Sequence, residues 1–396
     1  MERYSDSRKD IEPLHIGAMA AAIDGDGILW MSDSNYNGLY QYELEKNEMS
    51  LAWRFEDVEL YKDELHRHMK IAGDEIYLLP LKDNKIRIYN KRIRKEHSIE
   101  IPKERDEKIY TWLTEDKCWL FFENYTQDIM CFDFKTKTLF SDVRLNELCL
   151  SLTGRKDRRI WKGSNEQKLN IYNEENKQIY SINVNSYQYE VIDVSEIQET
   201  IDQVFYIDKC YWITLSNSQD VYLYERGVFT KYNVQEEAYI DDNIGNSYSN
   251  VISWEDEVLL LNGWAKDIRK ISKTTKTIEK AFREEKIDFS GNRNYGACFL
   301  TALRWKDSLL IIPLRSKHIL QCDKNIDVIN KFDSVSFLNE RDVDEMILAM
   351  IRNEMAVSET SEISTLRRYI NKINSVRGSR LESFFGATIY FKVKEI

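Results

Sequence analysis

Aromatic side chains lie beside amide and guanidinium groups in several predicted turns of this chain. The turns carry Tyr36, Asn37, Tyr125, Trp264 and Arg315, and one further loop carries Arg293 and Tyr295. Exposed Tyr and Trp rings with such neighbours can stack on sugar rings or hold peptide segments. These seven are therefore the candidate ligand-binding residues. The competing interpretation is that the rings cover strand ends and that the arginines pair with nearby carboxylates.

Two other stretches have the residue types of a metal site. Asp24-Gly25-Asp26-Gly27 resembles the start of a calcium loop, but the later ligands and the closing Glu are missing, so a turn is expected. His66 and His68, on either side of Arg67, would place two imidazoles on one face of a strand, whereas zinc needs three or four ligands. We therefore expect no metal and no cofactor.

Known catalytic motifs are absent from the sequence. It has no G-x-S-x-G, no H-E-x-x-H, no phosphate loop and no dinucleotide-binding fingerprint. A carbohydrate hydrolase or lyase could still assemble its site from distant loops, with Asp241, Asp242, Asp267 and Arg315 as candidates, if the required groups converge. We assign no catalytic residue and favour a protein that is not an enzyme.

Composition and charge narrow the class of partner. The 396 residues are 42% hydrophobic and carry a net charge of −11, which opposes non-specific binding to nucleic acid or anionic lipid. The six cysteines show no C-x-x-C spacing, and the N-terminus has no apolar signal core. We therefore expect a cytoplasmic protein whose partner is neither nucleic acid nor membrane.

The elements that must position the candidate residues repeat along the chain. An apolar anchor follows each charged turn at Trp30, Tyr77, Trp119, Trp161, Trp212, Leu259 and Leu310, with spacings of 47, 42, 42, 51, 47 and 51 residues. A second anchor follows 11 to 13 positions later, at Tyr42, Tyr89, Phe132, Tyr172, Tyr224, Ile271 and Cys322. Pro80 and Pro313 lie three positions after their anchors, where a strand would leave its ladder. Seven such units indicate a repeat architecture.

Each unit predicts four short strands joined by tight turns. In the third unit the strands are expected over residues 108–113, 117–123, 128–134 and 138–142. Four-stranded units of about 40 to 50 residues resemble the blades of the β-propeller superfamily, and the resemblance covers about residues 17–332. The Gly-His and Trp-Asp signatures of WD40 blades and the paired glycines of kelch blades are missing.

The resemblance implies an all-β fold: a seven-bladed β-propeller of four-stranded blades with a C-terminal helical extension. It places the candidate turns on one face, around the mouth of a central channel. Residues 17–335 would form the propeller, and the small residues over 18–22 suit an innermost strand. Residues 1–16 would form an N-terminal extension. The ring would close through this extension, through the terminal segment, or by packing of the first unit on the last.

Residues 336–396 change to a helical period. Val343, Met346, Ile347, Met350 and Ile351 predict a helix over 339–355, and a second helix follows with Ile363, Leu366, Ile370 and Ile373. Alternating apolar residues then favour a terminal strand packed on the ring. The stripe of Met346, Met350 and Met355 suits either docking on the propeller or a partner interface.

Three functions fit these features. The first is a non-enzymatic binding or scaffold protein that uses one propeller face for a peptide, protein or glycan. The second is the hydrolase or lyase with a site at the channel mouth. The third is an assembly protein that forms homo-oligomers through its C-terminal helices.

Overall fold

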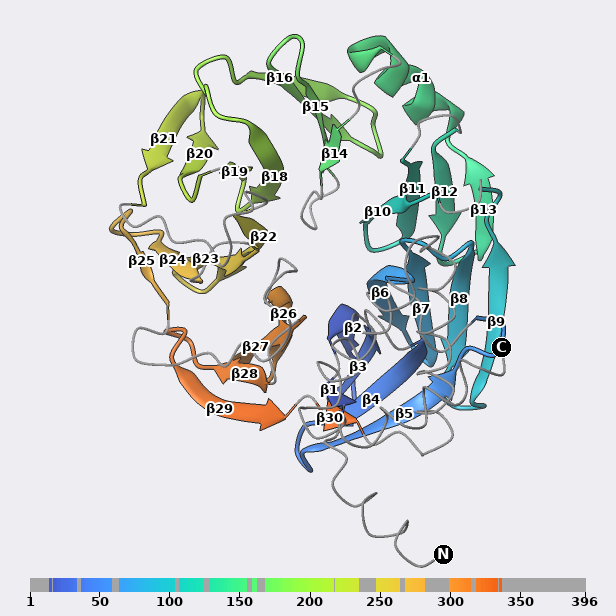
Figure 1. Cartoon of the computed structure of the whole chain (residues 1–396). Coiled ribbons are helices and arrows are strands. Elements are labelled where there is room, and N and C mark those ends of the chain that lie inside the picture. Colours follow the sequence, from blue (N-terminus) through green and yellow to red (C-terminus); the bar gives the residue numbers. More distant parts are fainter. Residues whose placement is uncertain are drawn as a thin grey trace, which may run out of the picture.

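The computed structural model describes most of the chain between residues 14 and 336. The described residues are 14–15, 17–33, 37–58, 64–103, 107–123, 128–154, 159–161, 168–216, 218–234, 247–263, 268–281, 299–314, 318–333 and 335–336. Within them, seven four-stranded antiparallel sheets surround a common centre (Figure 1). The fold is a seven-bladed β-propeller, as the repeat predicts. The expected C-terminal helices and terminal strand lie outside the described residues.

Each blade consists of four consecutive strands, of which the first is innermost (Figure 1). Blade 1 comprises β2 (Ala18–Ile23), β3 (Ile28–Asp33), β4 (Gly38–Glu43) and β5 (Glu48–Arg54). Blade 2 comprises β6 (His66–Ala72), β7 (Glu75–Pro80), β8 (Lys85–Asn90) and β9 (Lys95–Glu100). Blade 3 comprises β10 (Ile109–Leu113), β11 (Lys117–Phe122), β12 (Met130–Asp133) and β13 (Thr138–Ser141). The strands predicted for the third unit are thus confirmed to within two residues at each end.

The remaining blades follow the same order. Blade 4 comprises β14 (Arg159–Trp161), β15 (Lys168–Asn173), β16 (Gln178–Asn183) and β17 (Tyr189–Asp193). Blade 5 comprises β18 (Ile201–Ile207), β19 (Cys210–Leu215), β20 (Val221–Glu225) and β21 (Val228–Tyr232). Blade 6 comprises β22 (Tyr248–Trp254), β23 (Glu257–Asn262), β24 (Arg269–Ser272) and β25 (Ile278–Lys280). Blade 7 comprises β26 (Phe299–Trp305), β27 (Ser308–Pro313), β28 (His318–Cys322) and β29 (Val328–Asp333).

Blade 4 corrects one part of the predicted repeat. The repeat predicts that Trp161, like the other anchors, lies in the second strand of its unit, but it lies in the innermost strand β14. The residue of β15 that matches the other anchors in register is Asn170, which pairs with Trp161 and with Ser181. Because the second strand of blade 4 has Asn170 where the others have an apolar anchor, the aromatic residue that fits the repeat lies one strand earlier. The number of blades is unaffected.

A single helix is present among the described residues, between blades 3 and 4. Helix α1 (Val143–Thr153) begins where the Asp142 carboxylate accepts a hydrogen bond from the Leu145 amide at 3.0 Å. It buries Leu145 and Cys149 against the neighbouring blades. No described helix is long and apolar enough to cross a membrane.

The two ends of the ring region meet beside blades 1 and 7. Strand β1 (Leu14–His15) pairs with β30 (Val335–Ser336), so the segment before blade 1 lies next to the segment after blade 7 (Figure 1). The Tyr42 and Phe332 rings meet edge to face with centroids 6.2 Å apart. Lys306 also pairs with Glu45 at 2.6 Å. Both a strand pair and blade-to-blade contacts therefore join first blade to last.

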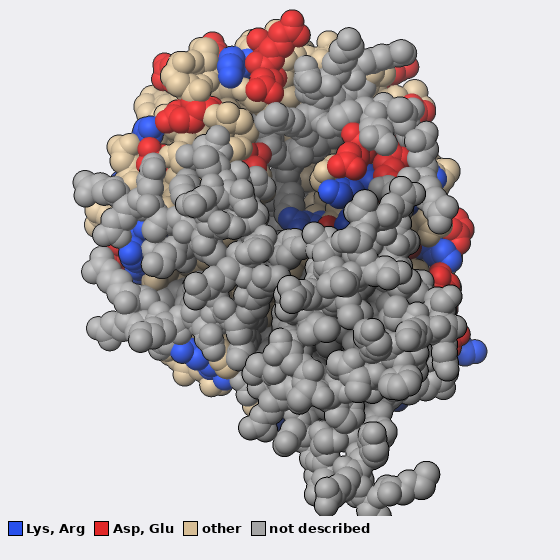
Figure 2. Space-filling model, in the orientation of Figure 1, with Lys and Arg blue, Asp and Glu red and all other residues tan. Residues whose placement is uncertain are grey.

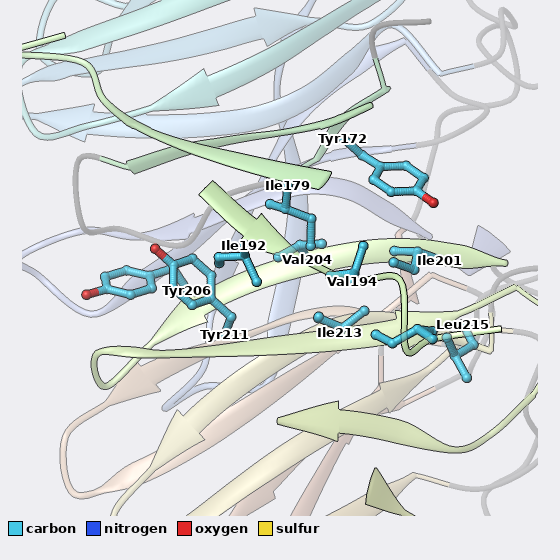
Figure 3. Packing of buried hydrophobic residues seen from close by; sticks show 11 residues of the cluster. Tyr172, Ile179, Ile192, Val194, Ile201, Val204, Tyr206, Tyr211, Ile213 and Leu215 are labelled. Carbon is cyan, nitrogen blue, oxygen red and sulfur yellow. The ribbon is translucent and has the colours of Figure 1, made fainter. Parts of the chain in front are cut away.

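Apolar side chains fill the space between neighbouring blades. Between blades 4 and 5, for example, Ile179 and Ile192 pack against Val204 and Ile213 (Figure 3). A four-stranded sheet cannot bury both faces alone, so each blade depends on its two neighbours. Near the centre, the alanine-rich strand β2 lies against both β6 and β26, as its small side chains predict.

Gly38 offers a test of packing within blade 1. A Cβ atom at this position would lie 2.6 Å from Leu51 Cδ1 and 3.1 Å from the Trp53 carbonyl oxygen, whereas one at Gly25 would have no atom within 4 Å. We expect Gly38→Ala to lower the free energy of unfolding by about 1 to 3 kcal/mol. Gly25→Ala should change it by less than about 1 kcal/mol. Urea unfolding of both variants checks this, and equal midpoints would contradict it.

Candidate functional site at the loop end of the channel

Five of the seven innermost strands contain a β-bulge at the same position. Each bulge lies opposite the last residue of the second strand and adds one unpaired residue to the inner strand. We call this the loop end of the ring, because the loops from second to third strands begin there. The five bulged residues, here called the mouth ring, are Met19, Arg67, Asp202, Ser249 and Leu300. Bulges re-aim side chains and are common beside functional sites.

Two members of the mouth ring join neighbouring blades. Met19 of blade 1 packs on Leu81 of blade 2 and on Leu314 of blade 7. Ser249 of blade 6 donates its hydroxyl hydrogen to the Phe299 carbonyl oxygen of blade 7. These contacts alone explain a bulge at those two positions.

Arg67 differs from both. It is half-buried, and no described residue gives it a hydrogen bond or an ion pair. Burial lowers the pKa of its guanidinium group below the ordinary value, although the nearby Glu64 carboxylate favours the charged form. Glu64 itself makes its ion pair with Lys82, at 3.2 Å, and none with Arg67. Arg67 is therefore a cation on an inner strand that makes no ion pair within the described part of the chain.

The residues on both sides of Arg67 are fixed to other strands. His66 Nδ1 lies 2.9 Å from the Ser32 hydroxyl, and His66 Nε2 lies 3.3 Å from Asp83. His68 Nδ1 lies 2.6 Å from the Thr111 hydroxyl of β10. The bulge thus directs the two imidazoles to different blades. Among the described residues, no group of three His, Cys, Asp or Glu side chains could hold a metal ion.

An exposed tyrosine lies near Arg67 on the next blade. Tyr110, the second residue of β10, is 42% exposed and its hydroxyl donates to Glu123 at 3.4 Å. Lys108 also approaches Glu123, at 4.0 Å. Lys and Arg atoms border a hollow near the centre of the ring in the space-filling view (Figure 2). Tyr110 and the charged groups of Lys108 and Glu123 therefore lie near Arg67 at the loop end of blades 2 and 3.

Six of the seven predicted binding residues cannot be placed. Tyr36, Tyr125, Trp264, Arg293, Tyr295 and Arg315 lie outside the described residues, as do Asp241, Asp242 and Asp267. Asn37 is described and is only 2% exposed, so its side chain lies within the protein at the loop end. The second strands that precede the turns of Tyr36, Tyr125, Trp264 and Arg315 all end at the loop end. The role of these residues stays a prediction.

Ser32, His66 and Asp83 have the residue types of a hydrolase triad, but they form a closed network. Their side chains are at most 3% exposed, and the same Asp83 oxygen accepts from Arg87 Nε at 2.6 Å. The Phe55 ring covers the imidazole edge to face, with centroids 5.3 Å apart. The arrangement joins blades 1 and 2 and leaves the serine no access to a substrate.

The acidic turn at residues 24–27 is likewise structural. The Asp24 carboxylate accepts hydrogen bonds from the Trp30 indole at 2.9 Å, from Lys91 at 2.8 Å and from the Ile28 amide at 3.0 Å. Burial alone would raise the pKa of Asp24, but these donors hold it below the ordinary value. The carboxylate is thus saturated by groups of its own and the next blade.

Comparisons with known proteins show the fold alone. No family model matches the sequence, and no curated protein matches it. A streptogramin B lyase structure is 12% identical with a TM-score of 0.51, covering 77% of this chain and 95% of the lyase. The extracellular domain of the putative one component system BT4673 from B. thetaiotaomicron is 12% identical with a TM-score of 0.51, covering 78% of this chain and 39% of that one.

Virginiamycin B lyase from Staphylococcus aureus gives a similar result, with 12% identity, a TM-score of 0.51 and coverage of 77% of this chain and 96% of the lyase. The chain is accordingly a seven-bladed β-propeller protein. One fold of this kind supports many unrelated activities, so function must be argued from the site.

Proposed function

We propose that this protein is a binding or scaffold protein that holds a peptide, protein or glycan at the loop end of its ring. The observation that supports the proposal most directly is the bulge shared by five inner strands at this end. Contacts between blades account for the bulges at Met19 and Ser249, whereas Arg67 makes no hydrogen bond or ion pair with a described residue, and β10 pairs without a bulge. The bulges re-aim inner-strand side chains at the end from which the predicted aromatic turns leave.

The chemistry available at this end suits polar ligands with flat or ring-shaped parts. Tyr110 presents an exposed ring beside the half-buried Arg67. The predicted turn residues Tyr125 and Trp264 would add further rings. Aromatic and arginine side chains are enriched among the few residues that contribute most of the binding energy of an interface.

The enzymatic alternative has less support. The lyases named above share the fold at 12% identity, which carries no activity to this chain. The Ser32–His66–Asp83 arrangement is closed to substrate. Paired carboxylates near the channel would be needed for a hydrolase, and the candidates for that role lie outside the described residues.

A ligand-array experiment tests the proposal. The full chain is screened by thermal shift against peptide and oligosaccharide arrays, and each hit is repeated with Tyr125→Ala/Trp264→Ala. The matched control is Arg92→Ala/Lys276→Ala, in tight turns at the opposite end of the ring. We expect hits that the loop-end variant loses and the control retains. Hits lost only in the control, or an array with no hit, would contradict the proposal.

A further inference from the structure

We infer that Arg67 forms an anion-binding site at the loop end of the channel and takes a carboxylate or phosphate group of the ligand. This inference rests on the proposed function and adds the chemical class of one ligand group. It would make Arg67 the cationic contact of the mouth ring.

The two interior arginines of blade 2 differ in their surroundings. Arg87 is 1% exposed and contacts three carboxylates: Asp83 at 2.6 Å, Asp57 at 2.7 Å and Glu96 at 2.8 Å. Arg67 has no such contact with any described residue. Burying a cation without a counter-charge costs folding free energy, so buried cations in proteins are normally paired.

The backbone position of Arg67 is held by the residues on either side of it. His66 is held by Ser32 and Asp83, and His68 by Thr111, so the bulge is anchored on both sides. A guanidinium group on a fixed backbone can meet two oxygens of one anion with little loss of conformational entropy. The arrangement suits a carboxylate or a phosphate.

The acidic side chains near Arg67 make their contacts with other groups. Glu64 is occupied by Lys82 at 3.2 Å, and Glu123 accepts from Tyr110 and lies 4.0 Å from Lys108. Asp202, the acidic member of the mouth ring, belongs to blade 5 and accepts from Gln203 at 3.3 Å. The charge of Arg67 therefore remains available to a ligand.

Calorimetric titration of the full chain with two probes tests the inference. Inorganic phosphate represents phosphate sources and succinate represents carboxylate sources. We expect one or both to bind in the millimolar range, and Arg67→Gln to weaken that binding at least tenfold. Arg67→Lys should retain part of it, because the charge stays while the planar fork is lost. Arg304→Gln, an exposed arginine near the opposite end of β26, should bind as the wild type does.

The outcomes separate this inference from the proposed function. Equal binding of both probes by wild type and Arg67→Gln, or no binding by wild type, would overturn the anion site. Array hits that survive in Arg67→Gln but vanish in Tyr125→Ala/Trp264→Ala would leave the proposed function standing without it. Unfolding midpoints of all variants confirm that each is folded at the titration temperature.

Discussion

Replacing Arg87 with methionine should lower the free energy of unfolding by about 3 to 5 kcal/mol. Arg87 lies between blades 1 and 2 and holds the carboxylates of Asp83, Asp57 and Glu96 together. Methionine fills much of the same space but supplies no donor. The variant therefore leaves Asp83, whose side chain is 2% exposed, and the largely buried Glu96 without the guanidinium group that contacts both.

The loss of unfolding free energy in Arg87→Met should be smaller in acid than at neutral pH. Burial alone would raise the pKa of Asp83, but His66 and Arg87 hold it below the ordinary value of 3.8. In the wild type the charged Asp83 carboxylate therefore contributes its full stabilisation at pH values above the ordinary pKa of 3.8. This stabilisation is lost as the pH falls through the lowered pKa. In Arg87→Met the Asp83 carboxylate lacks a cation that favours its charged form. Protonation of Asp83 in acid removes the buried, unpaired charge, so the variant regains part of the lost stability. The difference between variant and wild type should shrink from pH 7 to pH 4.

Urea unfolding at both pH values measures this difference. The matched control is Arg304→Met, because Arg304 pairs with Glu255 at 3.2 Å on the surface, with side chains 65% and 49% exposed. The control should change stability by less than about 1 kcal/mol at either pH. If both variants unfolded at the same urea concentration, the network would have no stabilising role.

The repeat was predictable because it reflects a packing requirement that every blade shares. Each second strand is a run of largely buried residues, nearly continuous in apolar character in β7, β23 and β27, and Pro80 and Pro313 end β7 and β27 as expected. Helix α1 was missed although its signal is in the sequence. Asp142 precedes Leu145, Leu148, Cys149 and Leu152, which have helical spacing.

The candidate site could be predicted only in part. The repeat places the turns of the candidate binding residues at one end of the ring. It gives no sign of the bulges in the inner strands. His66 and His68 read as neighbours on one strand face, and alternation in sequence gives no sign that Arg67 is an extra residue. The bulge depends on contacts with Ser32 and Thr111, from other blades. Such partners become known only once the blades are packed.

Asn170 in blade 4 differs in type from the residues at the same register position in the other blades. The matching residue in the other six blades is large and at most 5% exposed: Trp30, Tyr77, Trp119, Trp212, Leu259 or Leu310. Asn170 is fully buried, and neither polar atom of its amide has a hydrogen-bond partner among the residues that the structure describes. A buried polar group without partners costs about 1 to 3 kcal/mol. We therefore expect Asn170→Leu, which keeps the branching of the side chain, to stabilise the protein by about that amount.

The reciprocal exchange should act in the opposite direction and more strongly. Leu259→Asn would remove apolar contacts between blades 6 and 7 and bury an amide there, so it should cost about 3 to 6 kcal/mol. Urea unfolding of both variants measures the pair. A gain in one and a loss in the other would show that the same register position carries the same packing role in blades 4 and 6. Loss of stability in Asn170→Leu would show instead that the blade 4 position requires an amide, because the apolar side chain of equal branching could not replace it.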